Sequence, residues 1–399
     1  MRLPARRLRF APTTAALAAA LASTLAGAAV AAPPPHIAPD ERPVPGSTES
    51  ELWYGMDQAE KYLRQSPLVV HDPELQRYVE GVACKVTGDY CKDIRVYIVD
   101  YPVFNASMAP NGATLVFTGA LLRMRDESEL AVVLGHEFAH YKARHSLEGW
   151  ESSKRTSAVL STFGLISWVG GIPLAGEIAY LGGIGGLSKQ SRDNEREADR
   201  LGYASTIALG YDPQGGVRVW ERMRREEQAD KRHRSGGVFA SHPKTEERLT
   251  DMRAAAAQVT TAHPVVNAEA YRAAVRPFLQ RWMESELSRR TYDTSLQVLT
   301  ELKQDATPDT AALATFYLAE AHRRRNKGDD MDQAGKLYAE ALALPDPPAA
   351  AWRERAHYLH AHGDAAGATE ALRHYIAAAP DADDAALMRH ALAQWETTP

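Results

Sequence analysis

The chain has 399 residues, of which 45% are hydrophobic and 24% are charged, and these proportions exclude a disordered or fibrous protein. This length can hold about two to three domains. The formal net charge is -5, and an acidic balance argues against nucleic acid as a partner, because binding to phosphates depends on basic residues.

Residues 1–32 have the organisation of a secretory signal peptide. An uncharged stretch rich in Ala and Leu follows a start that contains four arginines, Arg2, Arg6, Arg7 and Arg9. Ala29-Val30-Ala31 then forms an A-x-A cleavage site. An uncleaved membrane anchor is the alternative, although the apolar stretch is short. Loss of the four arginines on cleavage changes the formal charge from -5 to -9. We expect an exported protein with a mobile, Pro-rich leader over 33–50.

The sequence contains two cysteines, Cys84 and Cys91, which are seven positions apart. In an exported chain this spacing predicts a small disulfide loop. Two free, buried thiols are the alternative. Metal binding by this pair is not expected, because no further cysteine could complete a Cys-rich site.

The segment before residue 120 predicts two helices and then two strands. Apolar residues recur with helical spacing between residues 51 and 86, with a break at 67–73. Residues 94–99 (IRVYIV) are β-branched and aromatic, as in a strand. Asn111-Gly112 is a turn signal, and 113–118 (ATLVFT) predicts a second strand.

The stretch His136-Glu137-Phe138-Ala139-His140 is an H-E-x-x-H motif after an apolar, helix-forming run. Two histidines four positions apart lie on one face of a helix and can bind one zinc ion. Glu137 could then take a proton from a water molecule. A helix that merely carries two histidines is the alternative. An edge strand beside the metal could hold an extended substrate by main-chain hydrogen bonds, with the substrate added as a strand near residues 105–110. An ordinary hairpin that supports the helix is the alternative.

A long apolar stretch follows the histidine motif. Residues 156–176 carry no charge, and Glu177 is the only charged residue up to Leu187. Pro173 and many glycines interrupt the stretch, which favours a buried hairpin or one that lines the active site. Peripheral contact of residues 158–187 with a membrane, or with an apolar surface of a client protein, is the alternative.

A second acidic motif lies at Glu195 and Asp199, in the run RDNEREADR. Zinc proteases with H-E-x-x-H need a third protein ligand, often a glutamate from a later helix. Residues four apart share a helix face, so Glu195 could bind zinc while Asp199 accepts the N–H of a ligand histidine. A solvated charged helix is the alternative.

Four motifs in order resemble the zinc metallopeptidases that include the HtpX and CAAX prenyl proteases. They are HEFAH, the run from Ser191 to Asp199, His242-Pro243 with Arg248, and the preceding segment from Asn105 to Gly112. The resemblance covers roughly residues 50–255, and four ordered motifs make it far more specific than H-E-x-x-H alone. It implies a zinc-dependent endopeptidase.

The resemblance also implies roles for individual residues. The zinc ligands would be His136, His140 and Glu195, the general base Glu137, and the support of a ligand histidine Asp199. His242 would either stabilise the oxyanion or cap the zinc in a resting state. Arg192 and Arg248 would brace the site or hold substrate, as would Asn105. Asn111 stands where the family often has Gly, and it leaves the turn intact because Asn tolerates positive φ. His145 has the wrong spacing for a ligand, and we expect it on a helix surface.

From about Ala268 the chain predicts paired helices with a 34-residue repeat. Three positions recur 34 residues later: Ala334, Tyr338 and Ala341 become Ala368, Leu372 and Tyr375. Tyr317 and Ala321 recur as Trp352 and Ala356. We expect a third, degenerate unit around Tyr292, Leu296 and Leu299. This is the tetratricopeptide pattern, with a concave binding face. A plain helical bundle is the alternative. The region also resembles the periplasmic, repeat-bearing BepA-like branch of the family, which acts on outer-membrane proteins during assembly.

We therefore expect an α+β protein: a mainly helical metallopeptidase domain with a small sheet over 51–260, then an all-α repeat domain over 268–399. The expected function is a periplasmic zinc endopeptidase with one zinc ion per chain. Its substrates would be unfolded or misassembled envelope proteins, and the repeats would bind clients or the outer-membrane assembly machinery. The alternative is a chaperone or scaffold whose protease site is gated by His242. A membrane-embedded protease is a weaker interpretation.

Overall fold

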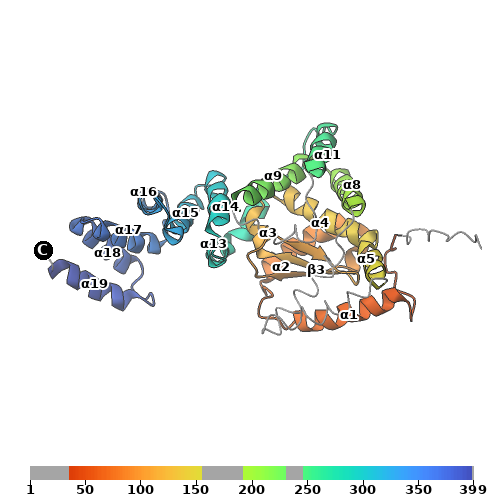
Figure 1. Ribbon diagram of the computed structural model, residues 1–399, viewed down its shortest axis with the longest axis horizontal. Coiled ribbons are helices and arrows are strands. Elements are labelled where there is room, and N and C mark those ends of the chain that lie inside the picture. Colours follow the sequence, from red (N-terminus) through yellow and green to blue (C-terminus); the bar gives the residue numbers. More distant parts are fainter. Residues whose placement is uncertain (1–35, 155–191, 231–245, 398–399) are drawn as a thin grey trace, which may run out of the picture. The chain divides into compact units, whose positions relative to one another are not determined.

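The computed structural model describes residues 36–154, 192–230 and 246–397, and the described part is mainly helical with one small sheet (Figure 1). This confirms the predicted α+β class. The predicted signal peptide, the whole apolar stretch 156–187, and His242 lie outside the described residues. None of the described helices combines the length and apolar character needed to cross a membrane.

The sheet has three strands: β1 (Arg95–Val99), β2 (Ala106–Met108) and β3 (Ala113–Phe117), in the order β1-β3-β2. β1 and β3 are the two predicted strands, and they pair in parallel. The hairpin partner of β3 is the short strand β2, which pairs with it in antiparallel fashion. The sequence did not predict β2, because a three-residue strand before a turn has too little alternation to be recognised.

Two helices before the sheet confirm the predicted pair. In α1 (Thr48–Leu63) the side chain of Ser47 caps the first turn by accepting a hydrogen bond from the Ser50 backbone. In α2 (Pro73–Thr87) Asp72 is the cap, and Pro73 occupies the first helical position, where a missing N–H has no cost.

The two faces of the sheet bury different helices. Leu115 packs with α1 residues such as Met56 on one face. Val116 packs on the other face with α2 residues such as Val79 and with Leu130 of α4 (Glu127–Lys142). Because neighbouring strand residues point to opposite faces, β3 joins both layers, and all five of its residues are buried. The histidine-bearing helix α4 is thereby fixed against the sheet.

The turn between β2 and β3 is held by a buried carboxylate. Glu60 accepts hydrogen bonds from Arg95 (2.6 and 2.7 Å), from the Tyr97 hydroxyl (2.6 Å) and from Asn111 Nδ2 (2.9 Å). Gly112 has φ +85°, and a Cβ there would collide with the Asp93 carbonyl, so the turn requires glycine. Asn111 therefore anchors the turn to α1 by its side chain.

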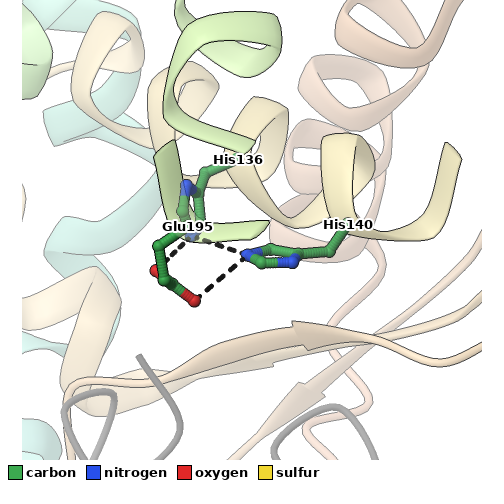
Figure 2. Close-up of side chains that lie close together, drawn as sticks. All are labelled: His136, His140 and Glu195. Carbon is green, nitrogen blue, oxygen red and sulfur yellow. Dashed lines mark hydrogen bonds and ion pairs between the residues drawn. The ribbon is translucent and has the colours of Figure 1, made fainter. Parts of the chain in front are cut away.

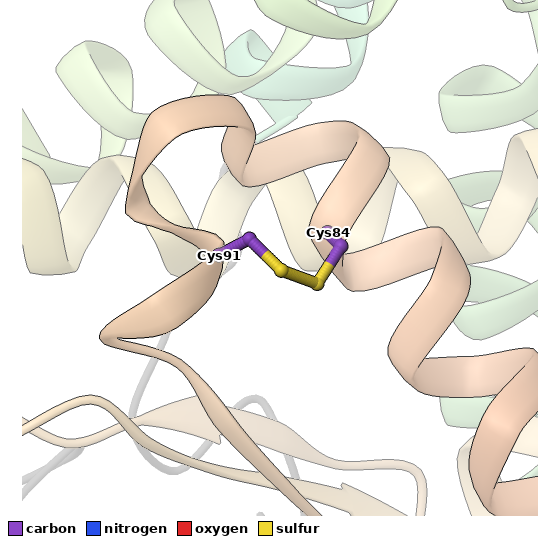
Figure 3. Close-up of a disulfide and its surroundings, with 2 residues drawn as sticks. All are labelled: Cys84 and Cys91. Atoms are coloured by element: carbon purple, nitrogen blue, oxygen red, sulfur yellow. A yellow bond between two sulfur atoms is a disulfide. The ribbon is translucent and has the colours of Figure 1, made fainter.

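The predicted disulfide is present. Cys84, on α2, and Cys91, in the short 3₁₀ helix η1 (Gly88–Lys92), are bonded with 4.6 Å between their Cα atoms (Figure 3). The bond closes the chain where α2 turns into β1, and no free cysteine remains in the chain.

The expectation of a mobile leader over 33–50 is wrong for its described part. Ile37 is 3% exposed and packs with Trp53, Phe138 and Tyr141. Its backbone N–H donates to the Lys142 carbonyl at 3.0 Å. The proline-rich composition of this segment gave no indication that Ile37 packs against the end of α4.

The other helices of the peptidase region are α3 (Thr118–Arg123), α5 (His145–Lys154), α8 (Arg192–Ala208), α9 (Gln214–Ala229) and α11 (Glu246–Ala257). The C-terminal region contains α12 (Ala268–Val275), η2 (Arg276–Phe278), α13 (Leu279–Ser288), α14 (Tyr292–Gln304), α15 (Ala311–Arg325), α16 (Asp330–Leu342), α17 (Ala349–Ala361), α18 (Ala365–Ala378) and α19 (Ala385–Thr397).

The C-terminal helices pack as successive neighbours, with α15 against α16 and α17 against α18. Among the positions that recur in the sequence, Trp352 is half-buried. All the others are buried: Tyr317, Ala321, Ala334, Tyr338, Ala341, Ala356, Ala368, Leu372 and Tyr375. Small residues at the crossings let neighbouring helices approach closely. The assignment of this region as tetratricopeptide repeats stays a prediction.

The hydrophobic core continues from α2 and α4 into the C-terminal helices, through Tyr271, Trp282 and Phe316. A buried ion cluster crosses the same junction. Arg123 on α3 is 1% exposed and donates to Glu226 on α9 (2.6 Å) and to Glu286 on α13 (2.8 Å). Because an unpaired buried charge is costly, this cluster favours one arrangement of the three helices.

Candidate metal centre

Two imidazoles converge on one side of α4. His136 and His140 are one helical turn apart, both are buried, and their Nε2 atoms lie 3.1 Å from each other. Helix α4 begins at the cap Asp126, whose side chain accepts from the Glu129 backbone, and its apolar residues anchor it on the sheet. The predicted helix therefore places both histidines at one point.

The third group comes from α8, as Figure 2 shows. Glu195 is 1% exposed, and its carboxylate lies 3.7 Å from His136 Nε2 and 3.5 Å from His140 Nε2. The two helices can approach this closely because Gly135 faces Gly202. A Cβ on Gly202 would lie 2.7 Å from the Gly135 carbonyl and from the His136 nitrogen. The backbone contact thus delivers the carboxylate to the imidazoles.

This cluster fits a zinc ion. In a tetrahedral site with bonds of about 2.0–2.1 Å, ligand atoms are about 3.3 Å apart, and the three separations here are 3.1, 3.5 and 3.7 Å. Two neutral imidazoles and one carboxylate are also the donor set of catalytic zinc sites that keep a fourth position open. Among the described residues this is the one group of three or more His, Cys, Asp or Glu side chains arranged in this way.

The far side of His136 faces an acid. Its Nδ1 lies 3.0 Å from Asp199 Oδ1, and Arg248 donates to both Asp199 oxygens at 2.6 and 2.8 Å. Burial alone would raise the pKa of Asp199, but the hydrogen bonds from Arg248 and His136 outweigh it and hold that pKa below its usual value. Arg248 also lies 2.6 Å from Glu195, so it links the two carboxylates.

The expectation that His145 is a surface residue is wrong. It is 2% exposed, its Nδ1 lies 2.8 Å from Nδ1 of His140, and its Nε2 lies 3.4 Å from Glu197 Oε2. Burial lowers the pKa of His145, although Glu197 acts in the opposite direction. The two histidines are five positions apart, and this spacing does not bring them together on a continuous helix.

The helix is interrupted at Arg144, and this explains the position of His145. Arg144 has φ +56°, so α4 ends at Lys142 and a separate helix, α5, starts at His145. The Arg144 guanidinium pairs with Glu49 at 2.8 Å and with Glu41. A non-glycine residue in the left-handed region carries no clear signal in the sequence, which is why this break between two helices was missed.

Three other predicted site residues, Glu137, Asn105 and Arg192, differ in their surroundings. Glu137 is 4% exposed and lines, with His136, a cavity whose other walls are mostly apolar and include Phe104, Val132, Tyr203 and Trp220. Asn105 is half-buried next to β2, and its Oδ1 accepts no hydrogen bond from the described residues. Arg192 is exposed at the first residue of α8.

Comparison with known proteins finds one peptidase family that matches the region of the candidate metal centre. Residues 70–256 match peptidase family M48. This match spans a little less than half of the chain. The resemblance predicted from the ordered motifs is thereby confirmed at the level of the family. The matched residues of the M48 domain include α4 and α8, which hold the candidate metal centre.

Curated relatives extend this similarity beyond the M48 domain. The chain is 28% identical over 242 residues to the beta-barrel assembly-enhancing protease of Escherichia coli K12. The aligned region covers 55% of this chain and 47% of the relative. It is 31% identical over 156 residues to the mitochondrial metalloendopeptidase OMA1 of Schizosaccharomyces pombe, with 39% and 44% covered. The chain spans about half the length of the curated relatives it matches.

Proposed function

We propose that this chain is a periplasmic zinc-dependent endopeptidase that cleaves unfolded or misassembled envelope proteins, with C-terminal helices that bind clients or an assembly partner. The observation that carries the proposal is the convergence of His136, His140 and Glu195 beside Glu137 within an M48 domain. The names of the relatives support the link to outer-membrane assembly. The N-terminal sequence of residues 1–32 supports export.

Glu137 is the proposed general base. A zinc ion held by the three ligands would polarise the scissile carbonyl and the attacking water. Glu137 follows the ligand His136 directly and lines the same cavity, where its carboxylate can take a proton from the water and pass it to the leaving amine. The apolar walls around it exclude bulk solvent, which strengthens the attraction between charges in the site.

The sheet supports a mode of substrate binding. β2 is an edge strand among the described residues and lies against α4. An extended peptide can add to such an edge by main-chain hydrogen bonds. Asn105, with its unoccupied acceptor beside this strand, is the proposed side-chain contact to substrate.

The test compares the mature chain with Glu137→Gln and with Glu151→Gln, a control at an exposed position on α5. Zinc content should be about one ion per chain in all three. Cleavage of an unfolded protein should fall by about 10²–10⁴-fold only in Glu137→Gln, because removal of a general base has effects of this size. Normal proteolysis by Glu137→Gln would refute the mechanism.

The identity of the substrates requires an experiment in cells. Envelope proteins should persist or lose a specific fragment when Glu137→Gln replaces the original chain, and those proteins are the candidate substrates. An unchanged set of envelope protein fragments would contradict the proposed role in envelope quality control while leaving the peptidase activity itself to the purified protein test.

A further inference from the structure

We propose that His145 is a positioning residue that fixes the tautomer and orientation of the metal ligand His140, and that Glu197 in turn orients His145. This inference rests on the proposed zinc site. The two rings lie 4.9 Å apart between centroids at an interplanar angle of 72°, and their Nδ1 atoms are 2.8 Å apart. Both side chains are buried, so water does not compete freely for these nitrogens.

A metal ion held by His136, His140 and Glu195 would fix every proton in this chain of contacts. His140 turns its Nε2 towards His136 and Glu195, so Nε2 is the ligand atom and carries no proton. The proton of neutral His140 is then on Nδ1, which donates to Nδ1 of His145. His145 must therefore accept at Nδ1 and carry its own proton on Nε2, which faces Glu197 Oε2 at 3.4 Å. One assignment satisfies all three groups.

The other ligand histidine has a matching support. His136 Nδ1 faces Asp199 at 3.0 Å, whereas His140 Nδ1 reaches an acid through a second imidazole. The three carboxylates involved, Glu195, Glu197 and Asp199, all lie on α8. A single helix thus supplies one ligand and the final acceptor behind each histidine, so the placement of α8 against α4 orients the whole centre.

The helix break at Arg144 gives His145 this position. Because α4 ends before it and α5 begins with it, the imidazole folds back over the last turn of α4. A histidine in this place that acted only by filling space would not need its Nδ1 within hydrogen-bonding distance of the ligand ring. The predicted contribution of His145 is therefore a hydrogen bond that an isosteric acceptor can replace.

The experiment measures zinc affinity by competition with a chromophoric chelator, in the full mature chain carrying Glu137→Gln so that self-cleavage does not interfere. Adding His145→Ala should weaken zinc binding by about 10–100-fold, the usual effect of removing the partner of a ligand histidine. Adding His145→Asn should restore affinity to within a few-fold of the parent, because Asn Oδ1 can occupy the place of the imidazole Nδ1. His71→Ala, at an exposed position, is the matched control and should bind as the parent does.

The melting temperature of each metal-free protein separates a structural role of His145 from a positioning role. A positioning role predicts that metal-free His145→Ala melts at the same temperature as the metal-free parent, whereas a structural role predicts a lower melting temperature. If His145→Ala binds zinc as tightly as the parent, or if His145→Asn is as weak as His145→Ala, the inference is overturned. If the protein with Glu137 and His145 both intact binds zinc but cleaves no substrate, the proposed function is contradicted and the inference about His145 stands. Intact cleavage by the protein with Glu137, together with zinc affinity unchanged by adding His145→Ala to Glu137→Gln, would overturn the inference and leave the proposed function in place.

Discussion

Two helix crossings in this protein use glycine in different ways. Between α4 and α8, Gly135 faces Gly202 and backbone meets backbone. Between α16 and α17, Gly335 faces the ring of Tyr358, a side chain that is only half-buried. The first crossing fixes a distance between main chains, and through it the distance between Glu195 and the two histidines. The second crossing depends on a side chain that can turn away.

The largest effect is expected at the first crossing. Gly202→Ala places a Cβ 2.7 Å from the Gly135 carbonyl, so α8 must move away from α4 and carry Glu195 with it. A displacement near 1 Å in a catalytic site costs about 100-fold in rate, and we expect at least this loss of peptide cleavage. Zinc affinity, measured by chelator competition, should fall in parallel.

Gly81→Ala is the control for the loss of a helical glycine. Gly81 lies within α2, and nothing stands within 4 Å of a Cβ added there. The substitution should leave cleavage unchanged and raise the free energy of unfolding by up to about 1 kcal/mol, because alanine favours a helix more than glycine does. If Gly202→Ala behaved as Gly81→Ala does, the close approach of α4 and α8 would not be what sets the metal centre.

A smaller effect is expected when Glu60 is neutralised. This substitution lowers the stability of the metallopeptidase region and leaves both helix crossings unchanged. Burial alone would raise the pKa of Glu60, but hydrogen bonds from Arg95, Tyr97 and Arg64 lower it to about 2. A carboxyl whose pKa is depressed on folding stabilises the protein at pH values above its ordinary pKa of 4.5. This contribution is lost as the pH falls towards 2. Glu60→Gln should lower the free energy of unfolding by about 2–3 kcal/mol near neutral pH.

Urea unfolding of both proteins over a range of pH checks this sign. The difference between wild type and Glu60→Gln should shrink steadily as pH is lowered from about 5 towards 2. Glu370→Gln, at an exposed position on α18, should show no such difference at any pH. A gap between wild type and Glu60→Gln that widened on acidification would contradict the role of ionised Glu60.

Local patterns were sufficient to predict much of this molecule. The spacing in HEFAH placed His136 and His140 on one helix face, and β-branched runs identified β1 and β3. The acidic motif was paired with the histidines only because zinc chemistry requires a third ligand. That Glu195 lies 3.5 Å from His140 depends on the backbone contact at Gly202, and a glycine inside a helical pattern does not reveal its partner.

The failures have a common cause, which is that they depend on single residues. His145 is buried because one non-glycine residue, Arg144, adopts positive φ. Ile37 docks although its neighbours in sequence are mostly polar or proline. β2 is too short to show alternation. In each case the deciding interaction is with a distant part of the chain, and periodicity within a window cannot report it.

The smallest effect is expected at the second crossing. Gly335→Ala would overlap the ring of Tyr358, but this ring lies on half-buried surface beside His362 and Arg355 and can rotate outward. The gain in helix propensity offsets part of the repacking cost, so we expect a loss of about 1 kcal/mol or less in the free energy of unfolding, with zinc affinity unchanged. Urea unfolding and chelator competition on the same protein measure both quantities. Loss of zinc from Gly335→Ala would mean that the two crossings are coupled through the shared core, and that the main-chain contact at Gly202 is not the separate determinant of the metal centre.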